Sequence, residues 1–160
     1  MVKNAKHKGG FTLGEMIVVL SILGFLAGLI FPPLQQAVQI YRAESVVRQM
    51  MADIKMLQQK SLAETSANYK MDIYGNLVGN YYVLRNLQTQ KTIKKVFLPS
   101  SMHFDDQLDN KSMLILSFGA SGSIHNKVGL TIRIHQNNPQ KTYGIVISGV
   151  VSRVRFTQIS

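Results

Sequence analysis

The sequence predicts an α+β protein in which one long N-terminal α-helix, transmembrane in its first half and amphipathic in its second, packs on an antiparallel β-sheet domain. Three observations predict this fold class. A run without charged residues separates Glu15 from Arg42, apolar residues then recur at three- and four-residue steps, and apolar and polar residues alternate from Tyr69 onward. The chain has 160 residues and no cysteine, so packing must stabilise it without disulfides or a thiolate metal site.

Residues 1 to 10 form a short basic leader that precedes the apolar segment. The leader contains three lysines: Lys3, Lys6 and Lys8. In a secretory signal peptide, the apolar stretch lies upstream of the cleavage site and is removed with it. Here the order is reversed, so a cut between Gly10 and Phe11 leaves the apolar helix as the N-terminus of the mature protein.

Residues 11 to 33 are predicted to form a transmembrane helix. The 21 residues from Phe11 to Phe31 would rise roughly 31 Å as a helix, which is close to a hydrocarbon core of about 30 Å. The lysines before the run place the N-terminus in the cytoplasm under the positive-inside rule. We therefore expect a single-pass protein of the cytoplasmic (inner) membrane whose C-terminal domain lies outside. The alternative is the buried core helix of a soluble protein.

Glu15 is a carboxylate within the apolar run and needs a partner. A charged group among lipid-facing residues costs on the order of a few kcal/mol, so such residues normally mark function. Cleavage before Phe11 creates a candidate partner, because the new α-amine is a cation one helical turn away or on a neighbouring subunit. Pairing between subunits would draw the helices into a bundle. The alternative is a solvated Glu15 at the headgroup boundary.

Together these residues resemble the class III signal of type IV pilins and pseudopilins. The match consists of Lys8-Gly9-Gly10-Phe11-Thr12-Leu13, Glu15 five residues into the mature chain, and the apolar helix, and it covers residues 8 to 33. The resemblance implies that a prepilin peptidase cuts after Gly10 and methylates the amine of Phe11. It also implies that Glu15 pairs with the N-terminus of an adjacent subunit during filament assembly. Gly14 departs from the family pattern, in which a large apolar residue is usual.

The same resemblance implies a structural function without catalysis. The chain would be a minor pilin or pseudopilin that enters or initiates the filament of a type II secretion, type IV pilus or competence system. Its expected partners are other pilins or pseudopilins, contacted through the N-terminal helix, the prepilin peptidase and a membrane protein of the assembly platform. The alternative function is a membrane-anchored binding module at a filament tip, such as a DNA-binding pseudopilin.

Pro32 and Pro33 lie at the end of the apolar segment. In a helix they would leave the carbonyls of Gly28 and Leu29 without their usual donors, at a cost of about 3 kcal/mol or more per proline. Two interpretations stay open. The prolines kink the helix, or Pro32 ends the membrane helix at the interface.

Helical periodicity continues in residues 34 to 66, which we expect to form an amphipathic helix. The residues of the predicted core face recur at three- and four-residue steps: Val47, Met50, Met51, Ile54, Leu57 and Ser61-Leu62. Polar residues occupy the other faces: Arg48, Gln49, Asp53, Lys55, Gln59 and Lys60. The cluster of Met50, Met51 and Met56 is expected to pack against a sheet, with a partner groove as the alternative.

Residues 67 to 160 are predicted to be β-rich and to form one pilin-like domain with residues 34 to 66. Seven runs have the composition or alternation of short strands: Tyr69 to Tyr74, Tyr81 to Leu84, Thr92 to Leu98, Met113 to Phe118, Leu130 to His135, Thr142 to Ile147 and Val150 to Phe156. Turn residues such as Gly75-Asn76 and Gly119 to Gly122 separate these runs.

Three C-terminal segments resemble the β-rich domain of minor pseudopilins, which are the H-type subunits of type II secretion, the related minor pilins and their competence counterparts. They are Leu116 to Gly122, Leu130 to His135, and Ile147 to Gly149 continuing through Arg153 to Arg155. The resemblance supports the same structural class as the N-terminal signal.

The sequence predicts no catalytic residues and no cofactor. His103, His125 and His135 do not form a His-Glu-x-x-His pattern, and the Gly119 to Gly122 segment lacks the lysine and the helix of a phosphate loop. One metal site is considered. Asp105, Asp106 and Asp109 offer three carboxylates to calcium, but their spacing is not the alternating one of a calcium-binding hand. A solvated acidic loop is the alternative.

The chain is basic, with 18 lysines and arginines against eight acidic residues. Without the first ten residues, 15 basic residues remain and the formal charge is +7, so the leader does not explain the excess. A basic surface favours anionic partners such as nucleic acid, lipid headgroups or cell-wall polymers. DNA contact is considered, with Tyr81, Tyr82 and Tyr143 stacking on bases. The alternative is a charged face toward neighbouring subunits or an anionic envelope. The cations concerned are Lys91, Lys94, Lys95, Arg133, Lys141, Arg153 and Arg155.

Overall fold

The computed structural model describes residues 10–65, 68–75, 79–105, 113–125, 129–148 and 153–159. In these ranges it confirms the predicted α+β class, because one long N-terminal helix packs on antiparallel sheets. The chain divides into two compact units, Met1–Val38 and Gln39–Ser160. The division lies close to the predicted boundary between residues 33 and 34.

The helix α1 spans Leu13–Ala63, 51 residues, as a single element. It passes through Pro32 and Pro33, so neither proline ends it, and a kink at these residues stays a prediction. At its C-terminal end, the N–H of Glu64 donates to the Lys60 carbonyl at 3.0 Å. Thr65 then adopts a φ of 49°, a left-handed conformation that terminates helices.

The first sheet has the strand order β3-β2-β1-β5, and all of its neighbouring strands are antiparallel. Its members are β1 (Tyr69–Tyr74), β2 (Tyr81–Asn86), β3 (Lys91–Phe97) and β5 (Met113–Phe118). Leu84 pairs with Lys94 but Arg85 pairs with Thr92, so β3 carries a bulge at Ile93. The bulge moves Thr92 to the same face of the sheet as Arg85.

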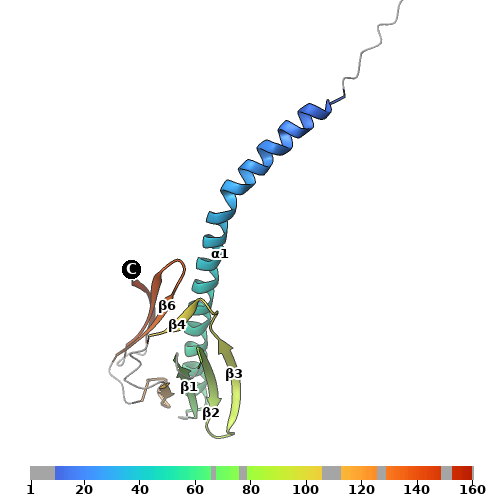
Figure 1. Ribbon diagram of the computed structural model, residues 1–160. Helices are drawn as coiled ribbons and strands as arrows, with labels where there is room; N and C mark the ends of the chain where they lie inside the picture. The colour runs from blue at the N-terminus through green and yellow to red at the C-terminus, as the bar shows by residue number, and fades with distance from the viewer. Residues whose placement is uncertain are drawn as a thin grey trace, which may run out of the picture. The chain divides into compact units, whose positions relative to one another are not determined.

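The second sheet has the order β4-β6-β7-β8 and is also antiparallel. Its members are β4 (Met102–Phe104), β6 (Leu130–Gln136), β7 (Lys141–Ile147) and β8 (Val154–Ile159). Both sheets lie beside the second half of α1 (Figure 1).

One continuous core joins the two sheets and α1. In the second half of α1, every fourth or third residue from Ala43 onward is buried in this core: Ala43, Val47, Met50, Ile54 and Leu57. Alternate residues of the strands complete it, including Met71, Ile73 and Leu84 of the first sheet and Ile132, Ile134, Ile145 and Ile147 of the second. The helical and strand periodicities of the sequence therefore predicted most of the residues that face the core. Leu62, which was expected on the apolar face of the helix, is 53 % exposed.

The predicted antiparallel β-sheet domain contains two sheets, whose strand order was not predicted. The strand predictions need two corrections. The strand β4 was not predicted, because a three-residue segment is too short to show an alternation. The last strand begins at Val154 and ends at Ile159, later than the predicted Val150 to Phe156, and residues 150 to 152 lie outside the described residues.

Gly122 allows the turn after β5 to approach α1. Its φ is +70°, and a Cβ built there would lie 2.9 Å from Cγ of Leu62. The N–H of Gly122 also donates to the carbonyl of Gly119 at 2.8 Å, which closes the turn. A side chain at this position would therefore strain the backbone and collide with the helix.

An ion pair joins α1 to the first sheet within the core. Asp53 is 6 % exposed, and Lys94 Nζ lies 2.8 Å from both of its carboxylate oxygens. The Tyr82 hydroxyl donates to Asp53 Oδ2 at 2.8 Å. Burial and this hydrogen bond raise the pKa of the Tyr82 phenol well above its usual value, so it remains a donor. The sequence predicted Asp53 on a polar face of the helix, and this expectation was wrong.

Candidate functional site

Thr12 and Glu15 form a capping box at the start of α1. Glu15 Oε2 accepts hydrogen bonds from the backbone N–H of Thr12 at 2.8 Å and from its hydroxyl at 2.9 Å. The backbone N–H of Glu15 donates in turn to Thr12 Oγ1 at 3.3 Å. These bonds satisfy donors that the first helical turn leaves without intrahelical partners. Among the described residues, Oε1 of Glu15 accepts no hydrogen bond, so the second oxygen stays open.

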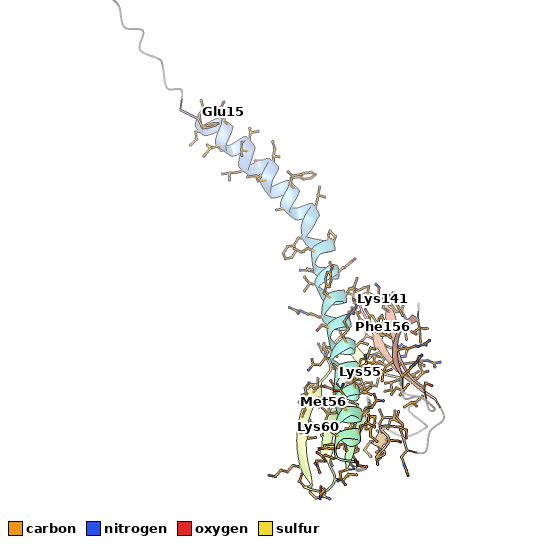
Figure 2. All side chains as sticks on the ribbon, turned by 180° about the vertical axis from the view of Figure 1, so that it is seen from behind. Glu15, Lys55, Met56, Lys60, Lys141 and Phe156 are labelled. Atoms are coloured by element: carbon orange, nitrogen blue, oxygen red, sulfur yellow. The ribbon has the colours of Figure 1, made fainter. Side chains whose placement is uncertain are left out.

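The first half of α1 exposes its apolar side chains within its own unit. Large apolar residues from Phe11 to Leu34 are exposed on all sides, and Phe11 itself is 83 % exposed. Glu15 lies at the beginning of this segment (Figure 2). The helix is long and apolar enough to cross a membrane, and none of its most apolar window is buried. The described residues thus contain a helix of the length and composition expected for a single-pass anchor.

The predicted cleavage pair directly precedes the capping box. Gly10 and Phe11 are exposed and lie before the first helical residue, Leu13. The capping box brings Thr12 and Glu15 together, and Phe11 directly precedes it in the chain, so the pairing of the Phe11 amine with Glu15 stays a prediction. The leader residues 1 to 9 lie outside the described residues.

The calcium prediction concerns a loop that is described only at its first residue. Asp105 lies 3.6 Å from Arg133 Nη1 and 3.8 Å from His135 Nε2, so a guanidinium and an imidazole of this chain already face it. Asp106 and Asp109 lie outside the described residues. Within the described ranges, no group of three or more histidine, aspartate or glutamate residues is arranged to hold a metal ion.

The seven cations considered for DNA contact do not form one surface. Lys91, Lys94 and Lys95 belong to β3 of the first sheet, but Lys94 turns inward to Asp53. The other four belong to the second sheet or the residue before β8: Arg133, Lys141, Arg153 and Arg155. Of the tyrosines considered for stacking, Tyr82 and Tyr143 are buried and cannot contact a base, and only Tyr81 reaches a surface.

Two open hollows lie on the second sheet. One has a volume of about 310 Å³ and is lined by Val146, Ser148, Arg153 and Arg155. The other has about 330 Å³ and is lined in part by His103, His135 and Lys141. The rings of His103 and His135 stack across neighbouring strands with centroids 5.3 Å apart, and His135 Nδ1 lies 3.0 Å from Thr142 Oγ1. The ring stacking and the His135–Thr142 contact therefore join side chains of neighbouring strands on the surface of the second sheet.

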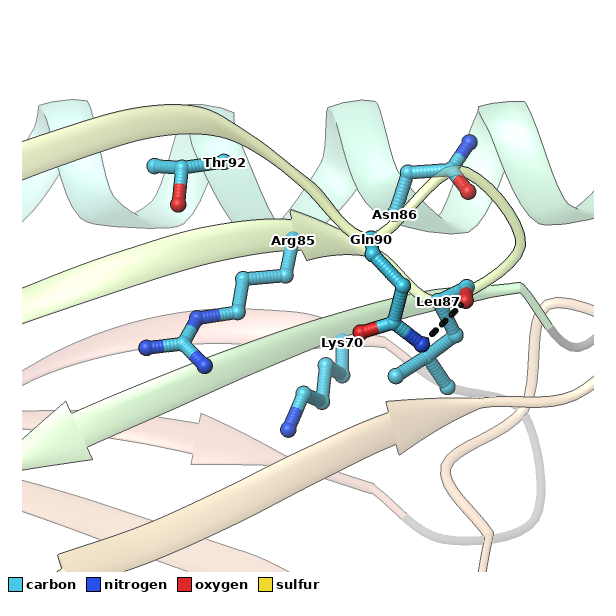
Figure 3. Close-up of a pocket in the computed structure, with 6 residues that line it drawn as sticks. All are labelled: Lys70, Arg85, Asn86, Leu87, Gln90 and Thr92. Atoms are coloured by element: carbon cyan, nitrogen blue, oxygen red, sulfur yellow. Dashed lines mark hydrogen bonds between the residues drawn. The ribbon is translucent and has the colours of Figure 1, made fainter.

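A smaller basic hollow lies on the first sheet at the turn between β2 and β3. It has a volume of about 90 Å³ and is lined by Lys70, Arg85, Asn86, Leu87, Gln90 and Thr92 (Figure 3). Lys70 and Arg85 project from neighbouring strands toward Asp72, with Nζ at 3.3 Å and Nε at 3.4 Å from its Oδ2. Asp72 is only 1 % exposed, and its Oδ1 has no hydrogen-bond partner among the described residues.

Local hydrogen bonds fix this turn. Asn86 Oδ1 accepts from the N–H groups of Gln88 and Thr89 at 2.9 and 3.0 Å, an Asx turn that orders the chain after β2. Gln90 Nε2 donates to the Leu87 carbonyl at 3.0 Å, which holds the Gln90 side chain beside the hollow (Figure 3). Sequence reasoning missed Lys70 and Arg85, although Lys70 alternates with the core residues Tyr69 and Met71.

Comparison with protein-family models, with curated proteins and with solved structures gives no match to this chain. The residues and their geometry therefore carry the functional inference.

Proposed function

We propose that this chain is a minor pilin or pseudopilin, a structural subunit of a type IV pilus-like filament. In this proposal, a prepilin peptidase removes residues 1 to 10 and methylates the amine of Phe11. The helix α1 then anchors the subunit in the inner membrane with its N-terminus in the cytoplasm. From there the subunit enters or initiates the filament through contacts between N-terminal helices, driven by an assembly platform that it does not contain.

The observation that carries this proposal is the position of Glu15. It is the single charged residue between Lys8 and Arg42, and it lies in the first turn of an exposed apolar helix. Carboxylates at such positions are costly in a membrane and normally serve a partner. Capping of the helix uses Oε2 of Glu15, and pairing with a neighbouring subunit would give the charge a second role.

The capping box supports different roles for the two carboxylate oxygens of Glu15, one in capping α1 and the other in binding a neighbouring subunit. Oε2 is engaged by Thr12, the residue before α1, whereas Oε1 accepts no hydrogen bond within the part of the chain that the structure describes. An N-terminal ammonium group of a neighbouring subunit could therefore bind Oε1 without breaking the cap. In a low-dielectric surrounding, such a charged pair is stronger than in water, which favours a packed bundle of helices.

Because the sequence has no cysteine, contacts between the N-terminal helices of neighbouring subunits can be tested with single introduced cysteines that form disulfides. Single cysteines are introduced in the full chain at four consecutive positions that cover about one turn: Leu20, Ser21, Ile22 and Leu23. After mild oxidation of native host membranes, we expect at least one of these variants to form a disulfide-linked species with itself or with a cysteine-substituted partner pilin. Non-reducing gels of the membrane fraction measure this product.

A cysteine at Thr89, which lies on an exposed turn of the globular unit, serves as the matched control and should remain uncrosslinked. If no position of the helical turn crosslinks, or if Thr89 crosslinks to the same extent, the proposed association through N-terminal helices is wrong.

A further inference from the structure

The strand β8 forms one edge of the second sheet, and none of its six residues is buried. In the part of the chain that the structure describes, β7 is the only strand that pairs with it. The backbone on the other side of β8 therefore has no neighbouring strand among the described residues, and we call this side the open edge.

The register with β7 identifies the backbone groups that face the open edge. The N–H of Ser148 donates to the carbonyl of Arg153, the residue before β8, at 3.0 Å, and the pairing then runs along β8 without a shift. In antiparallel strands, pairs that exchange hydrogen bonds alternate with pairs that do not. Alternate residues, beginning with Arg153, therefore bond to β7. The N–H and C=O groups of the others point to the open edge: Val154, Phe156 and Gln158.

The strand β8 lacks the features that protect an edge of the first sheet. There, β3 carries a bulge at Ile93 and three lysines, Lys91, Lys94 and Lys95, and such features keep sheets from pairing with another chain. The strand β8 has no bulge, no lysine and no proline. It therefore presents a regular edge of the ordinary length of a strand.

The two faces of β8 differ in chemistry. On the outer face, Arg155 and the preceding Arg153 line the hollow of about 310 Å³, and neither β7 nor β8 contains an acidic residue. On the inner face, Val154 packs against the core, and the ring centroid of Phe156 lies 6.1 Å from that of Tyr143. Phe156 is still 36 % exposed, so apolar surface remains beside the open edge.

A strand added to the open edge would place its side chains on the same two faces, because directly opposite residues of paired strands share a face. Acidic side chains at alternate positions would reach Arg153 and Arg155, whose guanidinium groups suit carboxylates. The apolar side chains between them would cover Phe156. A basic strand would form the same backbone hydrogen bonds, but it would add like charge beside the arginines.

We propose that the open edge of β8 binds an extended segment of another polypeptide, in which acidic and apolar side chains alternate. The segment adds a fifth strand to the four-stranded second sheet. Hydrogen bonds to the backbone of β8 supply affinity, and the side chains on the two faces select the partner.

A second copy of this chain does not have the required pattern. Pairing with another β8 would add its own Arg153 and Arg155 and no carboxylate. Elsewhere in the sequence, no two acidic residues are separated by a single residue, so no segment alternates acidic with apolar side chains. The charge of the outer face therefore favours a different polypeptide.

This inference goes beyond the proposed filament function and does not depend on it. Binding at β8 requires neither cleavage after Gly10 nor the charge of Glu15, so Glu15→Ala should leave it unchanged. Failure of peptide binding and failure of filament assembly are therefore separate results.

The test measures the fluorescence anisotropy of a labelled peptide with the full chain in non-ionic detergent micelles. The probe has about eight residues and alternates glutamate with valine. Its control has the same composition, with the glutamates and the valines in separate blocks, so it keeps the charge and loses the alternation. We expect the alternating peptide to bind at least about tenfold more tightly than the block peptide.

Replacing Gln158 by proline tests the backbone pairing. Its N–H faces the open edge, so proline removes a donor to the partner and leaves the bonds to β7 in place. Gln158→Ala is the matched control, because it removes the side chain and keeps the N–H. We expect proline to weaken peptide binding about tenfold and alanine to change it less than about twofold. Near-ultraviolet circular dichroism checks that both variants fold.

Peptides that are N-methylated at the valines or at the glutamates test the same bonds without altering the protein. In an antiparallel arrangement the valine N–H groups face β8, and in a parallel arrangement the glutamate N–H groups do. At least one of the two methylated peptides should therefore lose about tenfold or more in affinity.

Replacing Arg155 by glutamate tests the charge of the outer face. Arg155→Glu should weaken the glutamate–valine peptide about tenfold and strengthen binding of a lysine–valine peptide, because the charge preference is reversed. Lys91→Glu is the matched control, since it reverses an exposed cation on β3 of the first sheet. It should change the affinity for either peptide less than about twofold.

The proposal is overturned if the alternating peptide binds no more tightly than the block peptide, or if a folded Gln158→Pro binds it as Gln158→Ala does. It is also overturned if neither N-methylated peptide loses affinity, or if Lys91→Glu has the same effect as Arg155→Glu. A stable dimer of the wild-type chain that excludes the peptide would make a second copy the occupant and would likewise overturn it.

Discussion

Replacing Asp53 by alanine is expected to lower the free energy of unfolding by about 3 kcal/mol, the largest loss of any polar substitution considered for this chain. The substitution leaves the ammonium of Lys94 and the hydroxyl of Tyr82 without the carboxylate that they share at 2.8 Å. Lys94 is 35 % exposed and regains some solvation, which places the loss at the lower end of the range for a broken buried pair. Urea unfolding of the full chain in micelles, followed by the near-ultraviolet circular dichroism of its tyrosines, measures the change.

Glu44→Ala is the matched control because it removes another acidic residue of α1. Glu44 lies 3.7 Å from Arg48, whose side chain is 71 % exposed, and such surface pairs contribute about 0–1 kcal/mol. The double variant Asp53→Ala with Lys94→Met should lose less than the sum of its single variants, since no unpaired charge is left. A loss in Asp53→Ala equal to that of Glu44→Ala would contradict the role assigned to this pair.

Replacing Glu15 is expected to remove the subunit from the assembled filament while the protein still accumulates in the membrane. We expect Glu15→Ala and Glu15→Gln each to lower the assembled fraction at least about tenfold, which corresponds to about 1.4 kcal/mol of pairing energy. The physical reason is the loss of the negative charge that the proposed neighbouring N-terminus neutralises. Quantitative immunoblots of sheared filaments, normalised to the membrane pool, measure the ratio.

The capping box allows charge and helix capping to be separated. Glutamine at position 15 can still accept from the Thr12 N–H, so Glu15→Gln keeps the cap but removes the charge. Thr12→Ala has the reverse effect, because it removes the capping hydroxyl and keeps the carboxylate. Assembly should fail in Glu15→Gln and persist in Thr12→Ala. The opposite pattern would mean that Glu15 acts only as a cap.

Periodicity predicted most of the fold because the core of this protein is built from regular faces. Four residues of α1 are buried, as their spacing indicated: Val47, Met50, Ile54 and Leu57. The alternation from Tyr69 to Ile73 likewise placed β1, and its bounds agree with the structure. When one side of a helix or strand is buried, its apolar residues recur with the period of that element. This pattern can be recognised in the sequence without knowing which elements pack against it.

Features that depend on the pairing of distant elements were not predicted. Asp53 follows the polar pattern of α1, and its burial depends on Lys94, which is 41 residues away in the sequence. The bulge at Ile93 decides that Thr92 lies beside Arg85, and nothing in β3 alone reveals it. The basic hollow was missed for the same reason, since Lys70 and Arg85 meet only through the register of β1 and β2.

The start of α1 could be predicted more fully than the sheets. Its contacts join residues three positions apart, and the Thr-x-x-Glu pattern of Thr12 and Glu15 is itself a signature of a capping box. The sequence reasoning identified Glu15 but assigned its partner only to an N-terminal amine. The structure adds Thr12 as a local partner for one of the two carboxylate oxygens.

Intact-mass and N-terminal mass spectrometry of the protein extracted from native membranes tests the central claim most directly. The account predicts a chain that begins at Phe11, lacks residues 1 to 10, and carries one methyl group on its α-amine. A chain that retains Met1 and the leader would contradict it, because Phe11 would then have no free amine to pair with Glu15 of a neighbouring subunit.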